Sequence, residues 1–346
     1  MESIRLTQFS HGGGCGCKIA PAVLADLLAR SPAGIVPSQL LVGADTADDA
    51  AVYRLNERQA IVATTDFFTP IVDDPFDFGR IAATNAISDV YAMGATPIMA
   101  LAVVGMPLDK LPAEVIGRIL EGGASVCRDA GIPIAGGHSI DVLEPIYGLV
   151  ALGVVDPERV RRNDAARAGD RLLLGKPLGV GVLSAALKQG RLDGDGYREM
   201  LRHTTRLNTP GPRLAQIDGV HAMTDVTGFG LAGHLLEVCR GSRLAAELDA
   251  AALPLIAAAE GFARDGIATG ASARNWSGYG GQVELRAGVP AHLRTLLTDP
   301  QTSGGLLVTC AADALAAVRA VFADEGFDEL AEIGRLVAGA PAIVVG

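Results

Sequence analysis

The sequence has few aromatic residues, an excess of negative charge and no long apolar run. Only 4% of its 346 residues are Phe, Trp or Tyr, within a hydrophobic fraction of 49% that is ample for a packed core. The formal net charge of −10 argues against nonspecific binding to nucleic acid or to an anionic membrane. A phosphorylated small ligand stays open, because a metal ion can invert the local field.

No segment of the sequence predicts export or membrane insertion. Residues 1–5 are not followed by the apolar stretch of a signal peptide. The longest nearly apolar run, residues 145–155, is shorter than the about 20 residues that span a bilayer. The five cysteines are odd in number and lack the spacing of a disulfide framework, which is typical of a reducing compartment. We therefore expect a cytoplasmic protein with free thiols and no membrane partner.

Several common catalytic signatures are also absent from the sequence. It contains neither a G-x-x-x-x-G-K-[ST] phosphate loop nor the glycine-rich loop and catalytic loop of protein kinases. The histidines form no H-E-x-x-H motif and the cysteines form no C-x-x-C pair, which argues against zinc. If the protein uses ATP, it therefore does so on a less common fold.

Hydrophobic periodicity predicts an α+β fold, and the length suggests about two domains. In the first half we predict helices at 21–29, 76–94 and 112–130, and strands at 50–55, 59–65, 98–104, 132–135 and 146–155. In the second half we predict strands at 171–174, 220–223 and 306–309, helices at 180–187, 196–207, 211–217, 230–240, 253–264 and 291–298, an irregular glycine-rich span at 266–281, and a last helix at 312–325. A polar, basic segment at 155–164 marks the expected boundary, which gives an arm at 1–45 and domains at 46–156 and 157–346.

Residues 10–18, SHGGGCGCK, place two thiols and one ammonium among glycines. Glycine lets the backbone approach a ligand closely, so we interpret this stretch as a mobile arm rather than an incidental terminus. A cation near a thiol favours the reactive thiolate, and Lys18 follows Cys15 by three residues. A lysine also binds phosphate as a point charge. Cys15 and Cys17 alone could instead bind a soft metal or form a strained disulfide.

Five aspartates lie beside small or apolar residues at the ends of predicted elements: Asp48, Asp49, Asp66, Asp89 and Asp225. An isolated buried charge is very costly, so such carboxylates must be paired, hydrogen-bonded or bound to metal. A helix cap or salt bridge would explain any one of them, but the set together favours Mg²⁺. Because Mg²⁺ usually joins carboxylates to phosphate oxygens, the set predicts a nucleotide polyphosphate as partner.

Residues 136–139, Gly-Gly-His-Ser, follow the short strand predicted at 132–135. Their backbone N–H groups could cradle phosphate or ribose, and a plain tight turn explains them equally well. His138 is either a base or a satisfied loop histidine. A thiol, a lysine and a separate Asp/Mg²⁺ cluster together point to phosphoryl transfer to a chalcogen nucleophile.

Seven segments that span nearly the whole chain together resemble the selenophosphate synthetases (selenide, water dikinases): residues 10–18, 48–52, 64–68, 83–89, 135–139, 224–230 and 299–305. The Cys-Gly-Cys-Lys run distinguishes that family from its superfamily relatives, the aminoimidazole ribonucleotide synthetases, thiamine-monophosphate kinases and hydrogenase-maturation proteins. The resemblance implies a two-domain aminoimidazole ribonucleotide synthetase-like fold, described as α+β or α/β. In that fold the N-terminal domain supplies the sheets that form a barrel in a homodimer.

The resemblance also implies an activity and its site residues. The family makes selenophosphate, AMP and orthophosphate from ATP, selenide and water, with several Mg²⁺ ions. A monovalent cation such as K⁺ and a selenium-delivery protein are further expected partners. Motif positions assign catalysis to Cys15 and Lys18 and metal binding to Asp49, Asp89 and Asp225. They assign nucleotide contacts to Lys18, Thr46, Ala47, Asp48, Asp66, Asp89, Gly137, His138 and Ser139.

Two other functions fit parts of the sequence. A non-catalytic carrier of selenium or of a soft metal would use Cys15 and Cys17, but it leaves Asp66, Asp89 and Asp225 unexplained. A related ATP-dependent kinase or synthetase acting on another small molecule would have no use for the cysteines.

Overall fold

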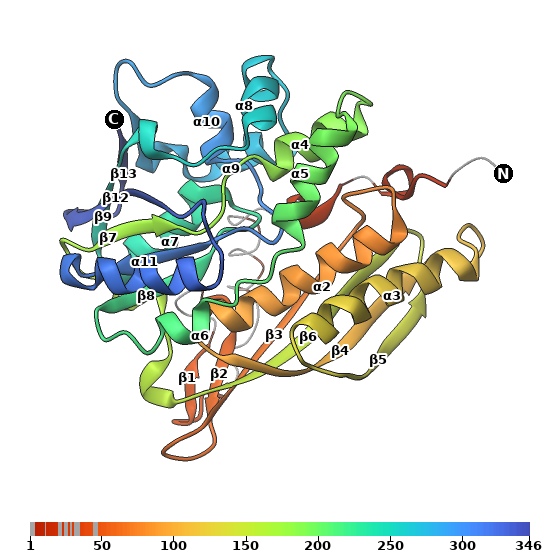
Figure 1. Ribbon diagram of the computed structural model, residues 1–346, viewed down its shortest axis with the longest axis horizontal. Coiled ribbons are helices and arrows are strands. Elements are labelled where there is room, and N and C mark those ends of the chain that lie inside the picture. The colour runs from red at the N-terminus through yellow and green to blue at the C-terminus, as the bar shows by residue number, and fades with distance from the viewer. Residues whose placement is uncertain are drawn as a thin grey trace.

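The computed structural model contains two mixed β-sheets with helices packed on them (Figure 1). It describes residues 4–10, 12–19, 23, 27, 30, 35–43 and 48–346. Among these residues, no helix is long and apolar enough to cross a membrane. Two short 3₁₀ helices, η1 (Leu6–Phe9) and η2 (Gly14–Cys17), precede the first strand.

The first sheet has six strands in the order β1-β2-β3-β6-β4-β5. The strands are β1 (Leu40–Val42), β2 (Ala51–Arg54), β3 (Ala60–Phe68), β4 (Thr96–Met106), β5 (Ile134–Asp141) and β6 (Ile146–Val155). Helices α2 (Pro75–Ala92) and α3 (Ala113–Asp129) lie side by side over one face of this sheet (Figure 1). β4 and β5 are parallel because α3 crosses over between them, whereas the other pairs are antiparallel.

The second sheet has seven strands in the order β10-β13-β9-β12-β7-β11-β8. The strands are β7 (Arg171–Leu174), β8 (Val220–Asp225), β9 (Leu244–Leu248), β10 (Val283–Leu285), β11 (Leu306–Cys310), β12 (Ala331–Ala338) and β13 (Ile343–Val345). The helices of this half are α4 (Val180–Lys188), α5 (Gly194–Thr204), α6 (Gly211–Leu214), α7 (Gly230–Ser242), α8 (Ala257–Arg264), α9 (Gly270–Tyr279), α10 (His292–Leu297) and α11 (Leu315–Asp324). Short 3₁₀ turns η3 (Pro157–Arg159) and η4 (Asn163–Ala165) connect the two halves.

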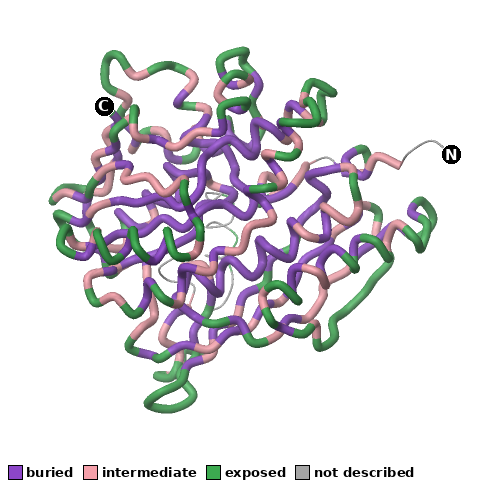
Figure 2. Tube along the Cα trace, in the orientation of Figure 1, coloured by how far each residue is buried: buried purple, intermediate pink, exposed green. Residues whose placement is uncertain are grey.

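Helix α2 lies at the centre of the molecule. It begins at Pro75 after Asp74, whose side chain accepts a hydrogen bond from the backbone N–H of Asp77. Most of its residues are buried, because the first sheet and α3 cover it on one side and β8, α5 and α6 contact it on the other (Figure 2). Close packing on α3 needs glycine: a Cβ at Gly79 would lie 1.9 Å from the carbonyl oxygen of Ile119. The helix therefore carries residues of the first half to the surface of the second.

Most elements predicted from periodicity are confirmed within a few residues, and two predictions are wrong. The strand predicted at 132–135 does not stop at Gly136, because β5 continues to Asp141 by parallel pairing with β4. The span 266–281 is not irregular: it contains α9, capped by Thr269, whose hydroxyl accepts from the N–H of Ser272. The last helix is confirmed as α11, and the strands β12 and β13 that follow it were not predicted. The helix predicted at 21–29 falls mostly outside the described residues.

Candidate active site

Carboxylates from both halves meet beside α2. Asp66 lies on β3, where alternate residues face the helix, and Asp89 lies on α2 itself. Asp225 ends β8 of the second sheet, and Asp49 precedes β2. The hydroxyl of Thr224 donates to Asp49 Oδ1 over 2.8 Å, which joins the loop before β2 to the second sheet. The structure thus brings together four of the five predicted aspartates.

The spacing of residues on α2 accounts for the convergence. Asn85, Ser88 and Asp89 stand at positions i, i+3 and i+4, so they share one face of the helix. Ser88 donates its hydroxyl to Asp225 Oδ2, and Thr64 of β3 donates its hydroxyl to Asp89. One helix face therefore contacts carboxylates of both sheets.

These carboxylates are held in an environment that disfavours their charged forms. Burial raises the pKa of Asp49 and Asp89 well above the ordinary range, and nearby Asp225 raises both further. Burial also raises the pKa of Asp225, although the hydroxyl of Ser88 opposes the shift. A cation placed among these groups would be stabilised by all of them.

Two carboxylate oxygens of the cluster are buried and unpaired within the described part of the chain. Asp49 Oδ2 and Asp225 Oδ1 are buried without a hydrogen bond among the described residues. Buried polar atoms are normally satisfied, so orphaned carboxylate oxygens call for a ligand that the protein does not supply. Hard oxygen donors of this kind fit Mg²⁺. The residues present therefore fit the metal that the sequence predicts.

The cysteine-bearing segment packs directly against this cluster. Cys15 lies in η2 with 1% of its surface exposed, and its thiol donates to Asn85 Oδ1 over 3.1 Å. Its backbone N–H donates to the hydroxyl of Thr302 over 3.1 Å. Gly14, at φ +54°, could not carry a Cβ, which would lie 2.5 Å from that same hydroxyl. The glycines therefore permit the close approach that buries Cys15.

The thiol of Cys15 differs from the sequence expectation. Lys18 does lower its pKa, as predicted, but burial raises the pKa first and Asp66 raises it further, so that the net value lies well above the ordinary one. The direction of this pKa shift favours the protonated thiol, which donates a hydrogen bond to Asn85, over the thiolate that Lys18 alone would favour.

Lys18 links the arm to the carboxylates. Its Nζ lies 3.4 Å from Asp66 Oδ2, and its side chain is 38% exposed against 8% for Asp66. Burial disfavours the charge of Lys18, but Asp66 above all, then Cys15, Asp89 and Asp225, raise the pKa well above its ordinary value. Lys18 therefore stays a cation between the carboxylates and the surface.

Comparison with known proteins matches both halves of the chain. The model of the AIR synthase related protein N-terminal domain matches residues 47–155, and that of the AIR synthase related protein C-terminal domain matches residues 167–346. A selenide, water dikinase of Pseudomonas straminea is 64% identical over 344 residues, covering 99% of this chain and 96% of the relative. The chain belongs to the selenide, water dikinase family. The dikinase of Dechloromonas aromatica (strain RCB) is 62% identical, with 99% of each chain covered.

Solved structures of more distant proteins share the fold. Thiamine-monophosphate kinase from Stenotrophomonas maltophilia K279a has a TM-score of 0.64 and 23% identity, covering 95% of this chain and 96% of its own. The hydrogenase maturation protein HypE from E. coli has a TM-score of 0.62 and 20% identity, covering 92% of this chain and 88% of its own. The two-domain α+β fold expected for this dikinase family is therefore confirmed.

Three residues in or beside the carboxylate cluster were not assigned a role from sequence. Asn85 is fully buried: its Nδ2 donates to Asp66 over 2.7 Å, and its Oδ1 accepts from the N–H of Ser303 over 2.7 Å. Thr302 holds the backbone of Cys15. Lys176, after β7, is 2% exposed and donates to the carbonyls of Ser303 and Arg206 over 2.8 and 2.6 Å. The Thr-Ser-Gly-Gly run was a visible signal, but it gave no indication of these partners.

The other predicted site residues make different contacts, lie at the edge of the first sheet or fall outside the described residues. Asp48 Oδ1 accepts from the N–H of Asn163 over 2.7 Å. Thr46 and Ala47 are outside the described residues. Gly137, His138 and Ser139 lie exposed on β5, at the edge of the first sheet. Gly137 and Asp66 lie on one line of paired residues across the sheet: Gly137 pairs with Ala102, Ala102 with Leu149, and Leu149 with Asp66. Three strand spacings, about 14 Å, therefore separate them in one protomer.

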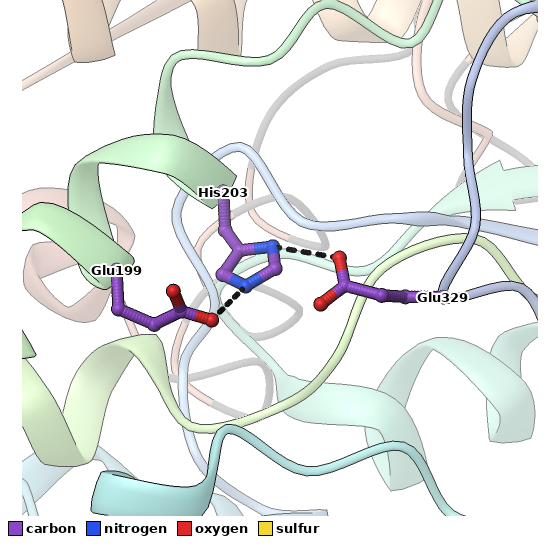
Figure 3. A group of neighbouring side chains, drawn as sticks. All are labelled: Glu199, His203 and Glu329. Carbon is purple, nitrogen blue, oxygen red and sulfur yellow. Dashed lines mark hydrogen bonds and ion pairs between the residues drawn. The ribbon is translucent and has the colours of Figure 1, made fainter.

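A second group of side chains has the composition of a metal site but not its electrostatics. Glu199, His203 and Glu329 bring their ligand atoms together, with the imidazole between the two carboxylates (Figure 3). Arg202 already occupies this group: its Nη2 lies 2.7 Å from Glu199 Oε1 and 2.7 Å from Glu329 Oε1. The same nitrogen lies 3.0 Å from His203 Nε2. A guanidinium in contact with all three groups makes this an ion-pair network rather than a cation site.

Proposed function

We propose that the site beside α2 makes selenophosphate, AMP and orthophosphate from ATP, selenide and water. The observation that carries the proposal is the junction of the thiol-bearing arm with the carboxylate cluster, where Lys18 lies 3.4 Å from Asp66. In the first step a new P–Se bond forms as the bond between the β–γ bridging oxygen and the γ-phosphorus breaks. In the second step water attacks the β-phosphorus of the ADP, and AMP leaves. Both steps are phosphoryl transfers, for which positioning and charge neutralisation supply most of the catalysis.

Asp49, Asp89 and Asp225 are proposed to hold Mg²⁺. Asp49 Oδ2 and Asp225 Oδ1 support this assignment, because they are hard donors without a hydrogen-bond partner among the residues that the structure describes. When bound, the metal would neutralise phosphate charge and so allow a triphosphate to lie among carboxylates. K⁺ stays a prediction from family resemblance, as do a selenium-delivery protein and a cytoplasmic location.

The chain's own residues have separate proposed roles. Lys18, a cation beside Asp66, would contact phosphate oxygens of the nucleotide, with Asp48, Asp66 and Asp89 completing the nucleotide contacts. Cys15 would hold or orient selenium, with Asn85 fixing the direction of its sulfur through the 3.1 Å hydrogen bond. The arm that carries both residues covers the carboxylates and would exclude water from the first transfer. A non-catalytic carrier is less well supported, because it gives the buried carboxylates no role.

A homodimer is proposed from the outer face of the first sheet. Side chains that point away from α2 and α3 on this face are apolar and only partly buried. They include Tyr53, Ile61, Phe67, Met99, Leu101, Val103, Ile140, Val150, Leu152 and Val154. A contiguous apolar face of this kind marks an interaction surface, and a second copy of the chain would cover it.

The same dimer would give the exposed residues of β5 a place in catalysis. His138 pairs with Val103, which pairs with Gly148 opposite Phe67, so all four share the outer face. Residues Gly137, His138 and Ser139 would then reach the nucleotide of the second copy rather than that of their own protomer. This supports the nucleotide contacts predicted for them, which a single protomer does not bring to the cluster.

The test compares Cys15→Ser with Cys127→Ser, which alters a buried cysteine of α3 remote from the arm. With selenide, ATP and Mg²⁺, Cys15→Ser should lose selenophosphate formation and keep ATP binding, because the carboxylates and Lys18 are intact. Cys127→Ser should keep both. Full activity of Cys15→Ser would remove Cys15 from the mechanism.

A further inference from the structure

A cavity of about 660 Å³ lies between the N-terminal arm and the second half of the molecule. The arm forms one wall through residues that include Gly16, Cys17 and Lys18. Helix α4 contributes Lys188, and helix α9 contributes Arg274. Lys18 borders this cavity and also contacts Asp66, so the cavity adjoins the catalytic site through one side chain.

The described lining of this cavity is cationic. It includes Lys18, Lys188 and Arg274, and it includes no Asp or Glu. Neither Lys188 nor Arg274 forms an ion pair with a carboxylate of the described residues. Lys188 instead donates to the carbonyl of Ser10 over 3.3 Å, and Arg274 to that of Gly16 over 3.0 Å. Two cationic side chains with no carboxylate partner among the described residues thus line one cavity in a protein whose net charge is −10.

We propose that this cavity is a binding site for a tetrahedral oxyanion, orthophosphate or its selenium-substituted analogue. The inference rests on the proposed function, whose two products other than AMP are anions of this class. A guanidinium fork and two ammonium groups suit phosphate oxygens, whereas the carboxylate cluster repels them. The volume exceeds that of one anion, so the anion is held with its water. Such a site would hold the anionic products next to Lys18.

The test measures binding of radiolabelled orthophosphate by flow dialysis at low salt, without nucleotide or selenide and in EDTA. EDTA removes any metal from the carboxylates, which then repel the anion. Orthophosphate that binds in EDTA therefore reports on the cationic cavity alone. The full chain should bind orthophosphate, and Lys188→Gln and Arg274→Gln should each weaken binding about threefold, with about tenfold for the double variant. Matched controls are Lys110→Gln and Arg58→Gln, both exposed on the first half and remote from the cavity.

A second arm distinguishes the two anions. Thiophosphate, with sulfur in place of one oxygen, stands in for the selenium product, and competition against orthophosphate shows which anion the site prefers. The proposal is overturned if the full chain binds neither anion in EDTA, or if the double variant binds them as tightly as the controls do. Because no turnover is involved, failure of the dikinase activity would not alter this result, and loss of this site would not remove the activity.

Discussion

Replacing Asn85 with alanine should break the contacts that hold the arm against the carboxylates. Its Oδ1 accepts from the backbone N–H of Ser303 over 2.7 Å and from the thiol of Cys15 over 3.1 Å. Its Nδ2 donates to Asp66 over 2.7 Å. The side chain is fully buried, so bulk water does not reach these groups to replace the lost hydrogen bonds.

The expected loss of stability follows from the groups left behind. The buried N–H of Ser303 is left without its acceptor, which costs about 1–3 kcal/mol. Asp66 Oδ2 keeps Lys18 but loses its hydrogen bond from Asn85, and a hydrogen bond to a charged group contributes about 1.5–3 kcal/mol. The thiol is a weak donor and adds little. We therefore expect Asn85→Ala to lower the free energy of unfolding by about 2–6 kcal/mol, with the upper end reached if no water enters the space.

The assay is urea unfolding followed by circular dichroism, with alkylation of Cys15 measured on the folded protein by mass spectrometry. Thr84→Ala is the matched control: Thr84 precedes Asn85 on α2, is buried, and donates only to the carbonyl of Arg80 in its own helix. The control should lose about 1 kcal/mol and leave alkylation unchanged. Asn85→Ala should be destabilised several-fold more and should alkylate faster, because the sulfur is no longer held. A loss below about 1 kcal/mol with unchanged alkylation would refute this reasoning.

Three further predictions concern the metal, pH and the arm. Mg²⁺ at a hundred times its dissociation constant should stabilise the folded state by about 2.7 kcal/mol. For 346 residues this raises the melting temperature by about 4 °C, as measured by differential scanning fluorimetry. Asp225→Asn should lose this shift, and an equal shift in the variant would exclude Asp225 as a metal ligand. Burial raises the pKa of Asp299 to about 7, so the folded state binds the proton of this carboxyl more tightly than the unfolded chain does. The stability that Asp299 contributes is therefore full below about pH 4 and is lost as the pH rises through 7. Asp299→Asn should remove up to about 4 kcal/mol of that pH dependence in urea titrations, and parallel pH profiles for variant and parent would contradict the assignment. Gly228→Ala would place a Cβ 2.8 Å from the carbonyl of Cys15, so Cys15 should alkylate about tenfold faster with ATP binding retained, and an unchanged rate would show that the arm does not pack there.

Local periodicity predicts much of this fold because the apolar spacing in most segments matches the helix or strand that they form. β3 alternates buried and more exposed residues, and α2 repeats apolar residues at intervals of three and four, so both were expected. The segment through Gly136 and Gly137 was not, since glycine is a poor strand former and only its pairing with β4 extends β5. The capping threonine of α9 was a local signal, but the surrounding glycines concealed it.

The candidate site shows the same division between local and long-range information. The sequence indicates Asp66, Asp89 and Asp225 as candidate site residues because each is a carboxylate with apolar neighbours. The family motifs then give them roles. The sequence does not show that Asn85 and Lys176 meet Ser303, since those contacts join residues more than a hundred positions apart. The thiol of Cys15 illustrates the limit most directly: the nearby lysine predicts a thiolate, but burial outweighs it.

The central claim is that the arm and the carboxylate cluster together transfer phosphate to selenium. Phosphorus NMR of the full chain with ATP, Mg²⁺ and selenide tests it most directly, because it resolves the nucleotide products and the phosphorus–selenium product in one sample. Selenophosphate, AMP and orthophosphate should form in equal amounts, and only when selenide is present. Nucleotide product that stops at ADP, or AMP release that does not depend on selenide, would contradict it.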